Sequence, residues 1–256
     1  MSHRAEGGRP ASQAADLTVV FVDPAGRTQR GRIAQLADAP LEEAIAIRKP
    51  ASYRGQPNLP GLWWSVTARR HLWYQSRLGR DQAIVLDFNP RVSGLAGQPF
   101  RLEWGDGGRA WSHVPAWFAR MEDGGALVVD CRPADGVGPA TAHRLAVTAR
   151  ACAEVGWHHA LVHGQDRVWM GNLRWLAAYR HPRYLQERVA AGLLARCAQP
   201  GELLAGAAAV GNPIAVLPVL YHLLWRWQLQ IDLRRGLHDR TIVSADGGAP
   251  ELEVAS

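Results

Sequence analysis

Short apolar runs separated by glycine and proline predict strands along the first part of the chain. Residues 17–23 have strand composition, and a turn at residues 24–26 allows residues 27–36 to pair back on them. Residues 50–62 hold three prolines and three glycines or asparagines, a composition that predicts an irregular crossing segment. Residues 92–104 then read as one or two strands around a Gln-Pro pair.

The clearest local signal is a hairpin. Two strand-like runs, residues 116–121 and 126–132, flank the sequence Glu122-Asp-Gly-Gly125. Asp-Gly between two such runs favours a tight turn, because glycine adopts positive φ without steric cost. We therefore expect these two runs to pair as neighbouring antiparallel strands.

Three- and four-residue spacing indicates helices between the strands. Residues 73–86 show this spacing and are closed by residues 87–90. Residues 141–156 are alanine-rich and end on a glycine, residues 158–163 predict a further strand, and residues 168–179 a further helix. This order predicts an α/β sandwich with a mixed central sheet flanked by helices.

The last quarter of the chain is mainly helical. Residues 184–197 and 202–210 predict two helices, and Asn212 is placed to cap a third over residues 213–227, with proline in the first position. Residues 229–233 and 241–244 then flank a basic loop. Three helices followed by a basic hairpin predict a C-terminal winged helix-turn-helix.

Composition narrows the class of protein. The 256 residues carry a net charge of +6, which favours an anionic partner such as DNA. Cys131, Cys152 and Cys197 are widely spaced without a CxxC pair, which excludes a disulfide framework and a zinc motif. No apolar run reaches the roughly 18 residues of a membrane span, and the N-terminus lacks a signal peptide, so we expect a cytoplasmic protein with no membrane partner.

Candidate chemistry lies on the second strand of the hairpin. Side chains alternate along a strand, so Asp130 and Arg132 are expected on one face and Cys131 on the other. Restriction-type nucleases build a metal site from an acid and a base spaced in this way. Taken alone, the same spacing also fits an ion pair on an exposed sheet. His158, His159 and His163 lack ligand spacing and favour structural roles. Apolar neighbours predict that most of six tryptophans are core residues: Trp63, Trp64, Trp104, Trp117, Trp157 and Trp175.

The order of several short motifs is more informative than any one of them. These motifs are Arg48-Lys-Pro50, Gly61-Leu-Trp-Trp-Ser65, Leu86-Asp-Phe-Asn-Pro90, Gln98-Pro-Phe100, Ser112-His-Val-Pro115, Val129-Asp-Cys-Arg-Pro133, Gly156-Trp157, Asn172-Leu-Arg-Trp-Leu176, Tyr179-Arg-His-Pro182 and Pro213-Ile-Ala-Val-Leu-Pro218. In this order, over residues 45–245, they resemble the TnsA-like endonuclease subunits of heteromeric bacterial transposases.

The resemblance implies a restriction-endonuclease-like core over residues 17–182 and a winged helix over residues 183–246, with tails at residues 1–16 and 247–256. Such a subunit cuts the 5′ ends of a transposon with Mg²⁺. Its implied partners are transposon-end DNA, a DDE-type transposase that acts on the 3′ ends, and an AAA+ ATPase regulator.

The implied catalytic positions include Gln98, His113, Asp130 and Arg132, with Asp130 as the metal ligand. The resemblance also places family acids where this chain has Gly79 on the helix and Ala116 after His113-Val-Pro115. Because Mg²⁺ is usually held by one or two carboxylates together with substrate phosphates, the loss of two acids predicts weak or lost cleavage. Asp81 and Asp87 are the nearby acids that would have to substitute.

Two functions therefore remain open: a Mg²⁺-dependent endonuclease subunit, or a non-catalytic subunit that assembles DNA and partner proteins. A free-standing winged-helix regulator is a third. Candidate DNA contacts on the winged helix are Asn212, His222, Arg226, Arg234, Arg235 and Arg240, and docking of a partner protein is the alternative for this domain.

Overall fold

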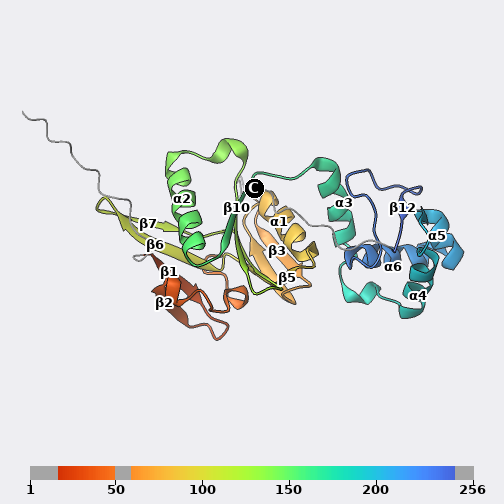
Figure 1. Ribbon diagram of the computed structural model, residues 1–256, viewed down its shortest axis with the longest axis horizontal. Helices are drawn as coiled ribbons and strands as arrows, with labels where there is room; N and C mark the ends of the chain where they lie inside the picture. Colours follow the sequence, from red (N-terminus) through yellow and green to blue (C-terminus); the bar gives the residue numbers. More distant parts are fainter. Residues whose placement is uncertain (1–16, 50–58, 246–256) are drawn as a thin grey trace, which may run out of the picture.

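The computed structural model describes residues 17–49 and 59–245, and this part of the chain forms a mixed α/β protein with six α-helices and several small sheets. The predicted tails and residues 50–58 of the predicted crossing segment lie outside the described residues. In Figure 1 the two four-stranded sheets occupy one part of an elongated molecule and the last helices the other.

The central sheet has four strands in the order β10-β9-β8-β5. Strand β8 (Trp117–Met121) pairs in antiparallel orientation with both β5 (Val92–Gly97) and β9 (Ala126–Cys131), whereas β10 (His158–Val162) pairs with β9 in parallel. The predicted hairpin between β8 and β9 is confirmed, and Gly124 in its turn has a φ of 85°. The sheet is therefore mixed, as the sequence predicts.

Two helices cover opposite faces of this sheet. Helix α1 (Arg77–Phe88) shares a buried apolar cluster with Leu127 and Val129, whereas helix α2 (Pro139–Glu154) shares a second cluster with Val128. Because neighbouring residues of β9 point to opposite faces, these two clusters define an α1 side and an α2 side of the sheet.

The second sheet has the order β2-β1-β6-β7 and is antiparallel throughout. Its strands are β1 (Thr18–Val22), β2 (Thr28–Arg32), β6 (Phe100–Asp106) and β7 (Arg109–His113). Since β6 and β7 are inserted between β5 and β8, they carry the chain away from the central sheet and back, and their apolar side chains join the α2-side cluster.

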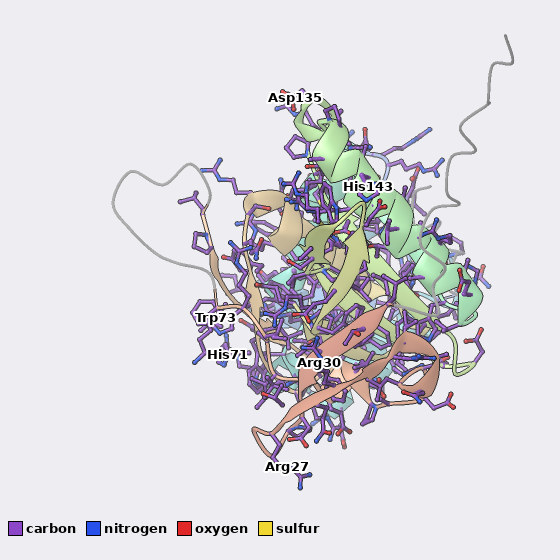
Figure 2. All side chains as sticks on the ribbon, turned by 90° about the vertical axis from the view of Figure 1, so that its left-hand side faces the viewer. Arg27, Arg30, His71, Trp73, Asp135 and His143 are labelled. Carbon is purple, nitrogen blue, oxygen red and sulfur yellow. The ribbon has the colours of Figure 1, made fainter. Side chains whose placement is uncertain are left out.

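The β1–β2 part of the second sheet carries arginines that are exposed to solvent. In Figure 2, Arg27 in the turn between β1 and β2 lies at the bottom of the view and Arg30 of β2 lies above it, whereas Asp135 and His143 of the α2 region lie nearer the top. Strand β2 is shorter than the predicted strand over residues 27–36. It ends at Arg32, where a 3-10 helix (Ile33–Gln35) begins, and another 3-10 helix follows at Leu41–Glu43.

The first helix begins later than the sequence predicts. Residues from Trp73 onward were expected to be helical, but β4 (Arg70–Tyr74) pairs there with β3 (Gly61–Ser65), which also replaces the end of the predicted crossing segment. The Ser76 hydroxyl accepts a hydrogen bond of 3.1 Å from the backbone amide of Gly79 and so caps the helix. The helix cannot extend upstream of this cap.

The C-terminal part of the chain adds four helices: α3 (Arg167–Ala177), α4 (Glu187–Arg196), α5 (Leu203–Val210) and α6 (Pro213–Trp225). Short 3-10 helices at Ala134–Gly136 and Pro182–Tyr184 precede α2 and α4. The predicted helix from residue 184 therefore starts three residues later.

Helix α6 has the predicted start and an earlier end. The Asn212 side chain accepts a 3.0 Å hydrogen bond from the amide of Ile214, which confirms the predicted cap. Trp227, which the sequence placed inside the helix, has a φ of 58°, and this left-handed conformation lies beyond the helix end at Trp225.

The predicted terminal hairpin differs in its pairing. Strand β12 (Ile242–Val243) pairs with β11 (Gly201–Glu202), a two-residue strand just before α5. The expected partner segment, residues 229–233, contributes one bridge between Gln230 and Ser244. Two-residue strands have no alternation to detect, so the sequence pattern missed β11.

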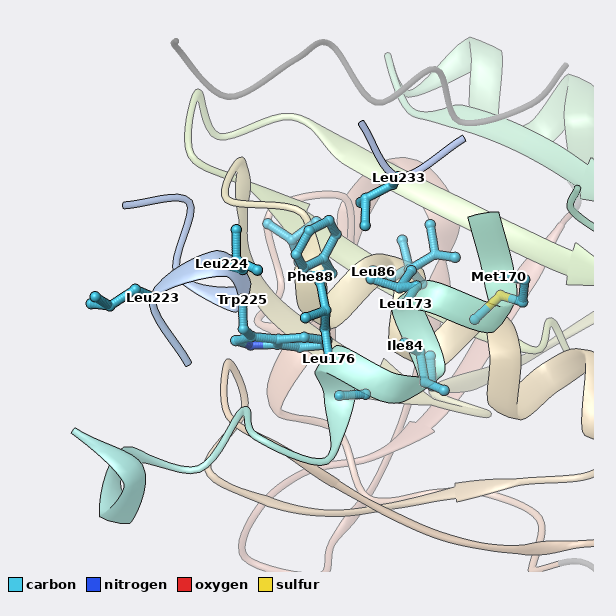
Figure 3. Packing of buried hydrophobic residues seen from close by; sticks show 14 of the residues in the cluster. Ile84, Leu86, Phe88, Met170, Leu173, Leu176, Leu223, Leu224, Trp225 and Leu233 are labelled. Carbon is cyan, nitrogen blue, oxygen red and sulfur yellow. The ribbon is translucent and has the colours of Figure 1, made fainter. Parts of the chain in front are cut away.

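One apolar cluster runs from α1 through α3 to α6 (Figure 3). The Phe88 ring centroid lies 5.1 Å from that of Trp225 and 4.3 Å from that of Trp227. The Trp227 indole also donates a 2.7 Å hydrogen bond to the Phe88 carbonyl. The division of the chain at residue 182 stays a prediction, and apolar packing is continuous across it.

No single helix in the described ranges is long and apolar enough to cross a bilayer. Helices α5 and α6 meet the length and composition test only together, and their axes differ by 118° at the break between them. Much of α6 is buried in the protein core, which accounts for its apolar composition.

Candidate functional site

A cavity of about 400 Å³ opens between the first turn of α1 and the ends of β8 and β9. It is lined by Leu59, Tyr74, Gln75, Ser76, Arg77, Leu78, Gly79, Gln98, Val114, Ala116, Trp117, Asp130, Cys131, Arg132 and Pro133. The structure thus brings Gln98, Asp130 and Arg132 to one cavity with the two positions, Gly79 and Ala116, where the resemblance implies acids.

Helix α1 is fastened beside the cavity by a buried hydrogen bond. The indole of Trp117, at the start of β8, donates to the Gly79 carbonyl over 3.1 Å. Trp117 is fully buried, so the bond fixes the first turn of the helix against the sheet. Gly79 and Ala116 therefore line the same cavity. Glycine has no side chain and alanine has only a methyl group, so neither side chain can supply an oxygen ligand to a metal ion.

The Asp130 carboxylate is held by two histidines. His113 Nε2 lies 3.0 Å from Asp130 Oδ1 and 2.9 Å from Oδ2, and His159 Nε2 lies 3.0 Å from Oδ2. Asp130 is 2% exposed. Burial raises the pKa of Asp130, but the hydrogen bonds from His113 and His159 outweigh burial and leave that pKa below its usual value.

This carboxylate faces α2 rather than α1. Its neighbours on β9, Val129 and Cys131, pack with the α1-side cluster, and alternation sends Asp130 to the other face. Its negative charge contributes to the raised pKa of Cys152, after burial, and Cys152 lies on α2. Asp130 therefore contributes to the wall of the cavity while its carboxylate points away from Gly79.

The expected metal site is not formed by these residues. No group of three His, Cys, Asp or Glu in the described ranges is placed to hold a metal ion. Asp130 is the one acid among the described residues that line the cavity, and imidazoles occupy both of its oxygens. A hard cation such as Mg²⁺ needs oxygen ligands, so the side chains here do not fit it.

Asp81 and Asp87, the acids that would have to substitute for the missing ligands, are bound to other groups. Both oxygens of Asp87 accept hydrogen bonds from the β3–β4 hairpin, including one of 2.7 Å from the Ser65 hydroxyl and one of 3.0 Å from the Trp63 indole. Asp81 is paired with Arg174 of α3. Neither acid lines the cavity.

Amide and guanidinium groups take the place of metal ligands in the cavity wall. The Gln75 amide donates a 2.9 Å hydrogen bond to Gln98 Oε1. Gln98 is 1% exposed, has a φ of 50°, and its Nε2 has no hydrogen-bond partner within the described residues. The Arg132 Nε is likewise buried without such a partner. The cavity therefore presents donors rather than metal ligands.

The cavity does not supply a nucleophilic thiolate. Burial, together with the charge of Asp130, raises the pKa of the Cys131 thiol to about 12. Arg132 opposes this shift only in part. Because a thiol with such a pKa stays protonated at neutral pH, Cys131 behaves as a structural residue.

The predicted DNA contacts at the C-terminal end separate into two groups. Arg226, Arg234, Arg235 and Arg240 are exposed, as are Asn212 and Ile214. His222 is 2% exposed, and its Nδ1 donates a 2.8 Å hydrogen bond to the Tyr179 carbonyl, so its predicted contact with DNA is wrong. Among the tryptophans predicted to be mostly core residues, Trp63, Trp104, Trp117 and Trp157 are buried, whereas Trp175 is 52% exposed.

Sequence reasoning missed the role of His159. It treated this histidine as structural, which fits its position on β10, but gave it no partner. The parallel pairing of β10 with β9 brings His159 beside Asp130, and no local pattern encodes that pairing.

Comparison with known proteins adds no identity to this site: no protein family matches the chain, and no curated protein matches it.

Proposed function

We propose that the protein is a TnsA-like subunit of a heteromeric DNA transposase that assembles DNA and partner proteins without cutting the 5′ strands itself. The observation that carries the proposal is the cavity at the position of the nuclease site. It keeps the shape of a site between helix and hairpin, but Asp130, the single acid that the described part of the chain contributes to it, is bound by His113 and His159.

The architecture supports the family assignment. A helix, an antiparallel run of β5, β8 and β9, a second helix and a parallel β10 give a mixed sheet covered on both faces, as expected for a restriction-endonuclease-like core. Three helices, α4 to α6, then precede a small sheet of β11, β12 and a bridge at Gln230, as expected for a winged helix.

The turn between α5 and α6 supports the same assignment. The two helix axes differ by 118°, and Gly211 and Asn212 connect them. Helix-turn-helix units cross at about 90–120° through a short turn that often contains glycine. Helix α6 would then correspond to the recognition helix.

The surface of α6 favours a protein partner for this domain. A DNA-reading helix usually presents basic and amide side chains to the groove. The most exposed large side chain of α6 is Ile214, at 85%, and Leu204 of α5 is 40% exposed. Trp175 of α3 lines a neighbouring cavity with Leu204. These exposed apolar side chains suit a partner subunit, for which we propose the DDE-type transposase.

We assign DNA binding to exposed arginine side chains that contact the phosphates, rather than to base contacts made by α6. The net charge of +6 and the exposed Arg226, Arg234 and Arg240 suit contacts with phosphates. Asp232 lies 3.4 Å from Arg235 and offsets part of that charge. An AAA+ ATPase regulator and a cytoplasmic location complete the proposal.

The products of transposition test the proposal. In cells that supply the transposase and ATPase subunits, an element whose 5′ strands stay uncut should give cointegrates, in which donor and target remain joined. Wild-type protein and the Asp130→Asn variant should give the same products, with Asp135→Asn, an exposed acid, as the matched control. Simple insertions that depend on Asp130 would contradict the proposal.

A further inference from the structure

We infer that the cavity at the start of α1 binds a phosphate group of DNA through protein donors alone, without a metal ion. The DNA source of this phosphate rests on the proposed function, whereas the preference for phosphate rests on the cavity itself. Its volume of about 400 Å³ lies within the range of roughly 300–1,000 Å³ found for ligand sites.

The first observation is an unpaired buried donor. Gln98 is 1% exposed and lines the cavity, and among the described residues its Nε2 has no acceptor. The Gln75 amide already donates to the other atom of this group, Oε1, so the N–H groups of Gln98 are the ones left without a partner. Buried donors are nearly always satisfied by protein, water or ligand, which makes Gln98 a marker of an acceptor.

The backbone at Gln98 supports this interpretation. Its φ of 50° lies in the left-handed region, which residues other than glycine and asparagine seldom adopt. Two backbone hydrogen bonds hold it there: the Gln98 amide donates to the Ala116 carbonyl over 3.0 Å, and its carbonyl accepts from Ile47 over 3.0 Å. Strained backbone of this kind clusters at ligand sites.

The second observation is a cation with an unpaired donor. The Arg132 Nε is buried and has no hydrogen-bond partner in the described ranges, and Arg132 is one of the residues that line the cavity. Arginine is always charged and binds phosphate oxygens through planar, paired donors. Arg77 adds a second positive charge at the exposed rim.

The N-terminus of helix α1 also favours an anion in the cavity. Helix α1 has 12 residues, and its first turn, Arg77 to Gly79, lines the cavity. Ser76 caps the Gly79 amide, while the amides of Arg77 and Leu78 have no intrahelical acceptor. Such amides and the helix dipole favour an anion.

The carboxylate of Asp130, the one acid among the described residues that line the cavity, opposes an anion only in part. The Asp130 carboxylate points to the α2 side, where His113 and His159 bind both of its oxygens. Gly79 and Ala116, which stand where the resemblance implies acids, add no further repulsion. The substitutions that end metal binding therefore leave a cavity suited to a phosphate.

The test measures phosphate binding in EDTA. Inorganic phosphate and short DNA duplexes with either a 5′-phosphate or a 5′-hydroxyl are titrated into the full-length protein by calorimetry. Gln98→Glu keeps an acceptor for Gln75 but replaces the free donor with a charge, and Arg132→Gln removes the cation. Arg91→Gln, an exposed arginine outside the cavity, is the matched control.

Each of the two cavity variants should weaken binding of inorganic phosphate at least tenfold, and Arg91→Gln should leave it unchanged. Thermal denaturation checks that each variant is folded. If Gln98→Glu does not fold, the phosphate affinity of Arg132→Gln alone tests the inference. Tighter binding of the 5′-phosphate duplex would identify a strand end as the source, and equal binding of both duplexes an internal phosphodiester.

Absence of saturable phosphate binding, binding that requires Mg²⁺, or binding unchanged in both cavity variants would overturn the inference. Copurification of the wild-type protein with the DDE-type transposase reports separately on the proposed function. A protein that copurifies but binds no phosphate would refute the inference alone.

Discussion

Asp130 and His113 lie on different sheets, yet His113 Nε2 sits within 3.0 Å of both oxygens of the Asp130 carboxylate. His159 completes the contact from β10. In a nuclease this strand position would face a metal ion. Here the contact between Asp130 and His113 joins the central sheet to the β2-β1-β6-β7 sheet, and Asp130 has a structural role.

Asp130→Asn should therefore destabilise the fold. Loss of the charge leaves His113 and His159 with a weaker acceptor in a buried site, at a cost of about 1–3 kcal/mol in the free energy of unfolding. Asp135→Asn, at an exposed position, should change that free energy by less than about 0.5 kcal/mol. Urea unfolding at neutral pH measures both. Equal stability of wild type and Asp130→Asn would show that the histidine contacts contribute nothing.

The same bond predicts a pH dependence. Because the pKa of Asp130 is lowered in the folded state, its contribution is complete above its pKa in the unfolded state. That contribution is lost as pH falls through the lower, folded pKa. Between about pH 5 and about pH 2, wild type should lose more stability than Asp130→Asn. Parallel stability curves for the two proteins in this range would contradict the assignment.

Gly79→Glu should stabilise α1. A Cβ at Gly79 would lie 3.5 Å from Ser76 Oγ and 3.8 Å from Tyr74 Cβ, which are ordinary contacts. Removing a helical glycine and completing a capping box with Ser76 should together add about 1 kcal/mol. In contrast, Gly124→Ala at the hairpin turn, where φ is 85°, should destabilise the protein. Melting temperatures that moved in the reverse directions would refute this local account.

Asn172→Ala should weaken the junction between α3 and the loop before β12. The Asn172 side chain donates to the carbonyls of Leu233, over 2.9 Å, and Arg235, over 2.6 Å, and accepts from the Leu237 amide over 3.2 Å. Loss of three such bonds should cost about 3 kcal/mol. Calorimetry should show one transition in wild type and one, at lower temperature, in the variant. Two separated transitions in wild type would show that the shared core does not couple the two halves.

Cys131 should resist alkylation in the folded protein. With its pKa raised to about 12 by burial and the nearby charge of Asp130, almost none of the thiol ionises near neutral pH. Iodoacetamide should therefore modify Cys131 only after denaturation, as followed by peptide mass spectrometry. Rapid labelling of the native protein would show an accessible, ionised thiol.

Much of the fold was predictable because its elements carry local signals. Asp123-Gly124 between two apolar runs identified the β8–β9 hairpin, and Asn212 before Pro213 identified the start of α6. The start of α1 was misplaced because apolar spacing extends upstream into β4, and only the Ser76 cap separates them. Two-residue strands such as β11 offer no pattern at all.

The candidate site was predictable as a set of residues but not as a geometry. The order of the motifs predicted that Gln98, Asp130 and Gly79 belong to one site, and all three line one cavity. Alternation along β9 was applied correctly, but which face met α1 depended on how the sheet packs. The partnership of Asp130 with His159 depends on a parallel pairing between distant segments, which no local pattern encodes.

The most direct test of the central claim is strand cleavage at transposon ends. Purified protein, its DDE-type transposase and ATPase partners, and labelled end DNA are incubated with Mg²⁺ or Mn²⁺, and 3′-end processing by the transposase serves as the control for assembly. We predict that 5′-strand cleavage by the wild-type protein stays at the level seen with Asp130→Asn. Robust 5′ cleavage by wild type that disappears in Asp130→Asn would contradict the account.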